Sequence, residues 1–241
     1  MIIMLQWAVL AVCVAVVLLR VPDVLRGRNR MTFGILVLAA LCILLTIQGP
    51  YVGIDRLLGG WNVTNLILRY LITATVLLVG IRTAKGLGSA RTYALITGRT
   101  GRWVLLATCV AQTVIFGLLD TRGSSAGLMT LADQGGRNAA LGPFYAAAGR
   151  AYPAFVSICL MPALLKTARS RLPRLVRAGA ALVLIGALGA AVSVPFSFLP
   201  ADDSPGRYLV IYTAVLGFVL GPMFFWLSGM RAKGPRNVSH Q

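Results

Sequence analysis

Seven apolar stretches, separated by short polar segments, divide the chain along almost its whole length. They cover residues 2–19, 31–48, 61–81, 103–119, 143–165, 178–198 and 208–230. A helix needs about 20 apolar residues to cross the roughly 30 Å hydrocarbon layer of a bilayer. The first stretch lacks the basic start and small-residue cleavage site of a signal peptide, so we expect it to remain as a helix. The pattern therefore predicts an all-α bundle of seven transmembrane helices in one domain, residues 1–230, followed by a short basic tail, residues 231–241.

The charged residues between these stretches alternate between two kinds of segment. Segments after the first, third, fifth and seventh stretches hold seventeen Lys and Arg residues and a single acid, Asp23. The remaining segments hold four arginines against five aspartates, among them Asp55 and Asp120. Short segments rich in Lys and Arg stay in the cytoplasm. The pattern predicts a multi-pass plasma-membrane protein with its N-terminus outside and its C-terminus inside the cell.

The composition is typical of a chain that uses lipid as its solvent. Hydrophobic residues make up 58% of the chain and charged residues 12%, whereas a soluble domain carries about twice that charge. The mean hydropathy is +0.81. Because the net charge of +17 falls in short segments between apolar stretches, it indicates topology rather than binding of nucleic acid. The predicted partners are membrane lipids, with anionic headgroups at the basic side.

Residues that carry chemistry are scarce within the apolar stretches. Cys13, Cys42, Cys109 and Cys159 each stand alone, and the single histidine, His240, lies in the tail. We therefore predict no metal site and no cofactor. The stretches contain no Asp, Glu, His or Lys, the groups that acid–base catalysis and proton-coupled transport normally use. The chain is expected not to be an enzyme.

Two of the connecting loops are longer than the rest. The cytoplasmic loop of residues 82–102 is basic and contains glycines, but no strand precedes it and no P-loop lysine follows. We expect a flexible loop that touches anionic headgroups. The outer loop of residues 120–142 contains five glycines. It is expected to be a connector, with a mobile lid as the alternative.

Polar residues inside the membrane concentrate on the third and fifth stretches. Successive spacings of three, four and four residues put four polar side chains of the third stretch on one helix face: Asn62, Asn65, Arg69 and Thr73. The fifth stretch carries a similar stripe around a second arginine, composed of Arg150, Pro153 and Ser157, with Tyr145, Gly149 and Tyr152 beside it. These two faces are the candidates for binding a ligand.

Arg69 lies seven residues past Asn62 and Arg150 seven past Pro143, each about 10 Å below the outer edge of its stretch. An arginine at that depth is costly unless it finds water, a partner or the headgroups. Three interpretations are open. The guanidinium groups can snorkel to the outer interface, bond to neighbouring backbone carbonyls, or face an outward-open cavity and bind an anion. In the third interpretation Asn65 and Thr73 would donate hydrogen bonds to the ligand.

Small residues four apart mark the last two stretches. Gly217 and Gly221 form a GxxxG motif, and Gly186 and Gly189 each precede another small residue at the same spacing. Such residues let helix backbones approach closely where no hydrophobic force drives helices together. We expect all four glycines to pack inside the bundle rather than in a dimer interface.

Four short motifs near the N-terminus carry a family resemblance: WAV at residues 7–9, LRVP at 19–22, RGR at 26–28 and LLGGWNVTNL at 57–66. Over residues 7–82 the chain resembles an uncharacterised actinobacterial family of seven-helix membrane proteins described as transporters. The resemblance implies a seven-helix fold and a transporter-like role. Many members also carry a cytoplasmic extension without a counterpart in this chain, so a signalling role housed there is not carried over.

Together these features favour a non-catalytic helical bundle that transports or senses a small anionic or amphiphilic molecule. The alternative is a structural or regulatory membrane subunit that acts through a partner protein. A ligand-binding bundle should gain thermal stability saturably with some compound. A subunit should instead co-purify with its partner and bind nothing alone.

Overall fold

The computed structural model describes residues 2–27, 30–121 and 136–198, and a number of helical residues between 210 and 228. Every element in these ranges is helical: α1 (Ile2–Leu25), α2 (Arg30–Thr46), α3 (Gln48–Leu57), α4 (Val63–Gly86), α5 (Ala90–Thr97), α6 (Arg99–Leu118), α7 (Gly136–Ala168), α8 (Arg174–Val192) and the 3-10 turn η3 (Pro195–Phe198). The prediction of an all-α chain is confirmed.

Four helical segments of the described chain are long and apolar enough to cross a bilayer: α4, α6, α7, and the run Arg174–Phe198 that joins α8 to η3. Helices α2 and α3 qualify only as a pair, and they meet at 91°. The apolar parts of α1, Gln6–Pro22, and of the C-terminal region, Leu216–Phe225, are shorter. The described residues therefore supply four or five candidate spans, and the predicted count of seven stays a prediction.

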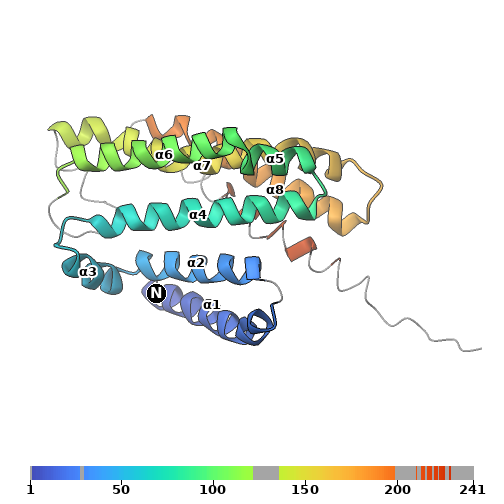
Figure 1. Ribbon diagram of the computed structural model, residues 1–241, viewed down its shortest axis with the longest axis horizontal. Helices are drawn as coiled ribbons and strands as arrows, with labels where there is room; N and C mark the ends of the chain where they lie inside the picture. The colour runs from blue at the N-terminus through green and yellow to red at the C-terminus, as the bar shows by residue number, and fades with distance from the viewer. Residues whose placement is uncertain are drawn as a thin grey trace, which may run out of the picture.

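The helices lie side by side along the long axis of the molecule (Figure 1). Helices α1 and α2 form one side, α6 and α7 the other, and α4 runs between them in contact with both α2 and α7. Helix α8 packs along α7, while α3 turns away from α2 at the end where α4 begins. Because α4 and α7 are adjacent, the two polar faces singled out in the sequence come from neighbouring helices.

The second apolar stretch ends differently from the prediction. Ile47 adopts an extended conformation (φ −84°, ψ 123°) and separates α2 from α3. Residues 48–57, expected to begin an outer loop, instead form a helix whose buried positions are Tyr51 and Asp55, one turn apart. This face packs against the start of α4. That burial explains why a segment that is not strongly apolar is helical.

The expected flexible loop of residues 82–102 contains helix α5. Ser89 caps this helix, its hydroxyl accepting a hydrogen bond from the backbone N–H of Thr92 at 3.4 Å. The Thr92 hydroxyl in turn donates to the carbonyl of Cys159 on α7 at 3.1 Å. Ile96 is buried in the main apolar cluster with residues of α4, α7 and α8. The expectation of a loop is wrong for these residues, because they form a helix that these contacts hold against the bundle.

The outer loop of residues 120–142 is described only at its two ends. The choice between a lid and a connector concerns mainly residues 122–135, which lie outside the described residues. At the C-terminal end of the loop, helix α7 already begins at Gly136.

The glycines of the last two apolar stretches lie against one another. A Cβ on Gly217 would overlap the backbone of Gly186, and a Cβ on Gly221 would overlap the side chain of Val183 on α8. A Cβ on Gly189 would come within 3.1 Å of the backbone of Ala214. The four glycines predicted to pack inside the bundle thus lie at contacts between α8 and the segment that follows it.

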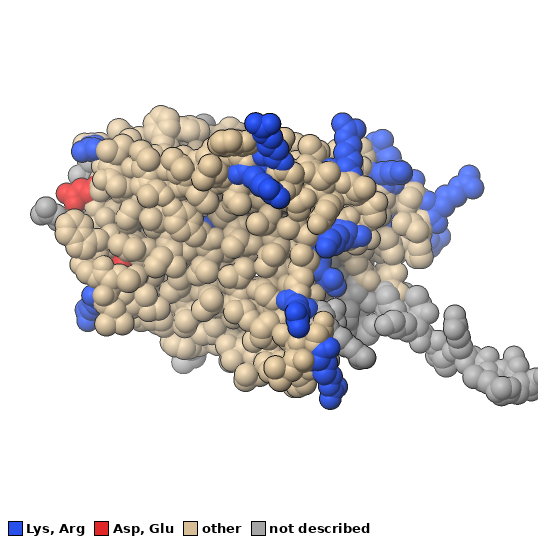
Figure 2. Space-filling model, in the orientation of Figure 1, with Lys and Arg blue, Asp and Glu red and all other residues tan. Residues whose placement is uncertain are grey.

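Charge is distributed unequally between the two ends of the bundle (Figure 2). In this view most Lys and Arg side chains lie toward one end, a few lie at the other, and an uncharged belt separates them, while Asp side chains are visible only at the less basic end. Large apolar side chains such as Val12, Leu106, Val110 and Leu188 are exposed on the sides of the bundle. This distribution is compatible with a protein embedded in a membrane.

Candidate anion-binding site

The N-terminus of α4 is held by a buried carboxylate. Asp55 on α3 has no exposed surface, and its two oxygens accept hydrogen bonds from the backbone N–H groups of Asn62 at 3.0 Å and Thr64 at 3.2 Å. The first N–H groups of a helix have no partner within the helix, and a negative charge is favourable there. Asp55, interpreted from the sequence as an outer-loop acid, therefore caps α4 from a neighbouring helix.

Asn62 connects three segments at the same end of the bundle. Its side-chain oxygen accepts a hydrogen bond from the Tyr51 hydroxyl at 2.8 Å, and its amide donates to the carbonyl of Thr121 at 2.9 Å. Its backbone lies in the left-handed region (φ 56°) after two glycines with positive φ. Asn tolerates that conformation better than most residues. The contacts fix the position of α4 relative to α3 and the end of α6.

Arg69 lies between α4 and α7. Its Nε donates a hydrogen bond to the side-chain oxygen of Asn65 at 3.3 Å. The same oxygen accepts a hydrogen bond from the buried hydroxyl of Tyr145 at 3.1 Å. The Arg69 Cζ lies 4.1 Å from the centre of the Tyr145 ring, within the range of a cation–π interaction. Asn65 and Tyr145 together determine where the guanidinium lies.

Gly149 creates the space that the guanidinium occupies. It lies one helical turn after Tyr145 on α7, and a Cβ at this position would overlap Nη1 of Arg69. Any other residue at position 149 would displace the guanidinium or the helix. The arginine, the asparagine, the tyrosine and this glycine form one unit, which we call the Arg69 cluster (Asn65, Arg69, Tyr145 and Gly149).

The cluster satisfies only part of the hydrogen-bonding capacity of Arg69. A guanidinium has five N–H donors. Within the described residues, the contacts supply Asn65 as an acceptor for Nε and bring one further oxygen, the Tyr145 hydroxyl, beside the group. None of the described carboxylates forms an ion pair with Arg69. At least three of the five donors therefore have no acceptor among the described residues and are open to a ligand or water.

Thr73 does not take the role predicted from its spacing. It is buried on the same face of α4, but its hydroxyl donates to the backbone carbonyl of Arg69 at 2.9 Å. This bond within the helix uses the only proton of the hydroxyl. In this structure Thr73 is a neighbour of the cluster and not a donor toward it.

Arg150 contacts a different part of the bundle. Its Nη1 donates to the carbonyl of Ser193 at 3.3 Å and to the hydroxyl of Ser197 at 2.6 Å. Ser193 is the C-cap of α8, where carbonyl groups without a helical partner attract a cation. The described contacts of Arg150 share no residue with those of Arg69. They agree with the interpretation in which the arginine bonds to neighbouring carbonyls.

The structure thus brings Asn65 and Arg69 together and places Arg150 apart from them. Sequence reasoning noted Tyr145 and Gly149 only as neighbours of Arg150. Their spacing of four residues puts them on one face of α7, but nothing in the sequence shows that this face meets α4. Asp55 was missed because it was assigned to a loop.

Two further buried polar side chains, on α6 and α7, each carry one atom that has no hydrogen-bond partner among the described residues. Gln112 on α6 approaches the carbonyl of Ala148 on α7 at 3.5 Å through its amide nitrogen, and its side-chain oxygen has no partner within the described part of the chain. The buried hydroxyl of Tyr152 on α7 likewise has none there. An unpartnered buried polar group costs about 1–3 kcal/mol. Tyr152 itself belongs to the main apolar cluster.

The described residues contain no group of three or more His, Cys, Asp or Glu side chains that could hold a metal ion. The four cysteines are free thiols. The structure provides no further test of the prediction that the chain has no metal site and no cofactor.

Comparisons of the chain with known proteins found no match. No family model, no curated protein and no solved structure matches the chain. The resemblance of residues 7–82 to the actinobacterial family therefore rests on the four motifs alone.

Proposed function

We propose that this chain is a multi-pass plasma-membrane protein that binds a small anion, or the anionic end of an amphiphilic molecule, at Arg69. It transports or senses that ligand and catalyses no reaction. The proposal includes seven spans, with the N-terminus outside the cell and the C-terminus in the cytoplasm. The observation that carries it is the Arg69 guanidinium, which two side chains orient while at least three of its N–H donors have no acceptor within the described part of the chain.

A ligand anion explains the arrangement better than a purely structural role. A guanidinium inside a membrane is stable only where its charge and donors are satisfied. A carboxylate or phosphate accepts two parallel hydrogen bonds from a guanidinium. Asn65 holds Nε and Tyr145 covers one face, so the terminal amino groups are pre-oriented for such an acceptor.

The direction of the Arg69 side chain supports access from outside. Asn65, which holds Nε, lies one turn nearer the N-terminal end of α4. That end is the predicted outer end, and helix side chains lean toward the N-terminus. An anion arriving from outside therefore meets the guanidinium before it meets the apolar cluster deeper in the bundle.

The test is a thermal-shift measurement on the full chain in detergent. The probes are sulfate, inorganic phosphate, acetate, succinate and a short-chain anionic lipid. We expect at least one probe to raise the melting temperature saturably, with an affinity that falls as inert salt is added. Arg69→Gln should abolish the shift because it removes the charge, and Arg69→Lys should weaken it because it removes the bidentate geometry.

The matched control is Arg150→Gln, which removes the same charge from the neighbouring helix. It should lower the melting temperature without ligand and leave the ligand shift intact. Equal loss of the shift in both variants would contradict a site at Arg69. If no probe stabilises the wild-type protein and it co-purifies with another membrane protein, the subunit role replaces the proposed one.

A further inference from the structure

A second basic site lies at the break between α5 and α6. A groove of about 570 Å³ is lined there by Gly98, Arg99, Arg102, Trp103 and Leu106. Both arginines are on the surface, and so are the tryptophan and the leucine, with 59% and 52% of their surfaces exposed. The groove therefore combines two cationic groups with an apolar wall.

The glycines at the break explain how the groove forms. Gly98 ends α5 and begins α6 in an extended conformation (φ −75°, ψ −171°), and a Cβ on it would overlap the carbonyl of Ala94. A Cβ on Gly101 would overlap the carbonyl of Ile96. The first turn of α6 is thus packed directly on the last turn of α5, and the arginines on either side of Gly101 project from the break.

One arginine is held in place across the break. Nε of Arg102 donates a hydrogen bond to the carbonyl of Thr97 at 3.1 Å, which leaves its two terminal amino groups directed away from that bond. Gly98 offers no side chain to cap α6, and no side-chain cap is present. The positive end of the α6 dipole therefore adds to the charge of Arg99 and Arg102.

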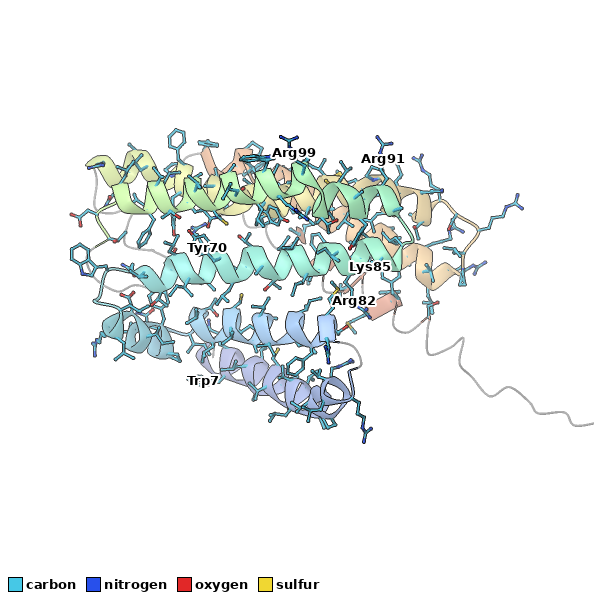
Figure 3. All side chains as sticks on the ribbon, viewed as in Figure 1. Trp7, Tyr70, Arg82, Lys85, Arg91 and Arg99 are labelled. Atoms are coloured by element: carbon cyan, nitrogen blue, oxygen red, sulfur yellow. The ribbon has the colours of Figure 1, made fainter. Side chains whose placement is uncertain are left out.

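The position of the groove along the bundle matches the boundary of the hydrocarbon layer. Helix α6 has 20 residues, and at about 1.5 Å per residue it is about 30 Å long, the thickness of that layer. Figure 3 shows that Arg99 lies farther from the basic end of the bundle than Arg91, Arg82 and Lys85. With the C-terminal end of α6 at the outer boundary, Arg99 lies where the phosphates of the inner leaflet lie.

The surface that continues from the groove is apolar. Trp103, Leu106, Val110 and Val114 follow one another at helical spacing and are all more than half exposed. A tryptophan at this level is typical of the membrane interface. This apolar face can pack against an acyl chain, whereas the guanidinium groups of Arg99 and Arg102 can bind the phosphate ester of the same lipid.

We propose that the groove (Gly98, Arg99, Arg102, Trp103 and Leu106) binds the headgroup of an anionic phospholipid of the inner leaflet. The phosphate lies between Arg99 and Arg102, and an acyl chain lies along Trp103 and Leu106. The site shares no residue with the Arg69 cluster, so binding at either site can fail without the other. Its assignment to the inner leaflet rests on the orientation given in the proposed function.

The experiment measures the lipids bound to the full chain in mixed micelles that contain equal amounts of phosphatidylglycerol and phosphatidylcholine, by native mass spectrometry. We expect preferential retention of phosphatidylglycerol. The double variant Arg99→Gln/Arg102→Gln should lower that preference by about tenfold or more, because each basic residue near the headgroups contributes to anionic lipid binding. The charge-matched control Arg82→Gln/Arg91→Gln, at the same end of the bundle, should change it much less, because neither residue lines the groove.

Soluble glycerol phosphate distinguishes a lipid from a free phosphate. It should not displace phosphatidylglycerol, because it lacks the acyl chains that the apolar face contacts. Displacement would show that the ligand is a soluble phosphate and would overturn the proposal. Equal losses in the two double variants would also overturn it, since they would show general charge attraction.

Folding of the variants is checked by size exclusion and melting temperature. If the double variant does not fold, Arg99→Gln alone is measured, because the Arg99 side chain makes no hydrogen bond within the described residues. That single variant should still lower the preference for phosphatidylglycerol. An unchanged preference would contradict the site.

Discussion

The absence of a side chain at Gly149 determines where the charged guanidinium of Arg69 lies. The guanidinium occupies the volume where a Cβ of residue 149 would lie. Gly149→Ala should therefore move Arg69, abolish the anion-induced thermal shift and destabilise the bundle by about 1–3 kcal/mol through overpacking. The measurements are thermal unfolding with and without the ligand.

Gly142→Ala on the same helix is the control for that change. A Cβ at Gly142 meets nothing within 4 Å, and Ala is the better helix former by about 1 kcal/mol. This variant should keep the ligand shift and unfold at the same temperature as the wild type or higher. An identical response of the two variants would show that Gly149 has no special relation to Arg69.

Asp55 provides the second prediction at this scale. Asp55→Ala removes the acceptor of two backbone N–H groups at the buried start of α4, and each unsatisfied group costs about 1–3 kcal/mol. We expect a clear loss of stability in denaturant unfolding. Asp55→Asn keeps one acceptor oxygen and should fall between the wild type and the alanine variant. Wild-type stability of Asp55→Ala would rule out the capping role.

At the scale of elements, α8 and the segment after it pack through glycines. A Cβ added to Gly221 would overlap the side chain of Val183 and would lie 2.9 Å from the carbonyl oxygen of Gly179. Gly221→Leu should force these backbones apart and lower stability by about 1–3 kcal/mol. Gly117→Leu on α6 is the control, because a Cβ there meets open space. The result is measured by thermal unfolding in detergent, and an unchanged melting temperature for Gly221→Leu would place that face toward lipid.

Helices α3 and α5 are the elements that the sequence pattern did not predict. Both are short, with 10 and 8 residues, and neither forms a long apolar run. An isolated helix of that length is marginal in water. Tyr51 and Asp55 stabilise α3 through hydrogen bonds with Asn62, beyond the end of the helix. Thr92 and Ile96 stabilise α5 through contacts with residues of other helices. Such contacts cannot be obtained from local periodicity.

At the scale of the whole molecule, the charge asymmetry predicts the orientation. A reporter fused after Gln241, or inserted within residues 20–30, should be cytoplasmic, and one within residues 120–142 should be external. The physical reason is that Lys and Arg are retained in the cytoplasm during insertion. Alkaline phosphatase, active only outside, and a fluorescent protein, active inside, provide the paired measurement. An active phosphatase at the C-terminus would contradict the odd number of spans.

The sequence by itself determined the helical class, the apolar stretches that become α4, α6, α7 and α8, and the segregation of charge. These follow from hydropathy and helical period, which are local properties of the chain. It also identified Asn65 and Arg69 as members of one helix face, because their spacing of four residues is itself a helical property.

Only the tertiary structure decided what those side chains meet. It placed Tyr145 and Gly149 of α7 against Arg69, and it paired the Thr73 hydroxyl with a backbone carbonyl of its own helix. It also directed Arg150 toward the end of α8 and buried Asp55 at the start of α4. In a membrane the hydrophobic pattern drives each helix into lipid but does not select its neighbours, because lipid is as apolar as most helix surfaces. The choice of neighbours depends on close approach at small residues and on hydrogen bonds between helices, and these depend on residues far apart in the chain.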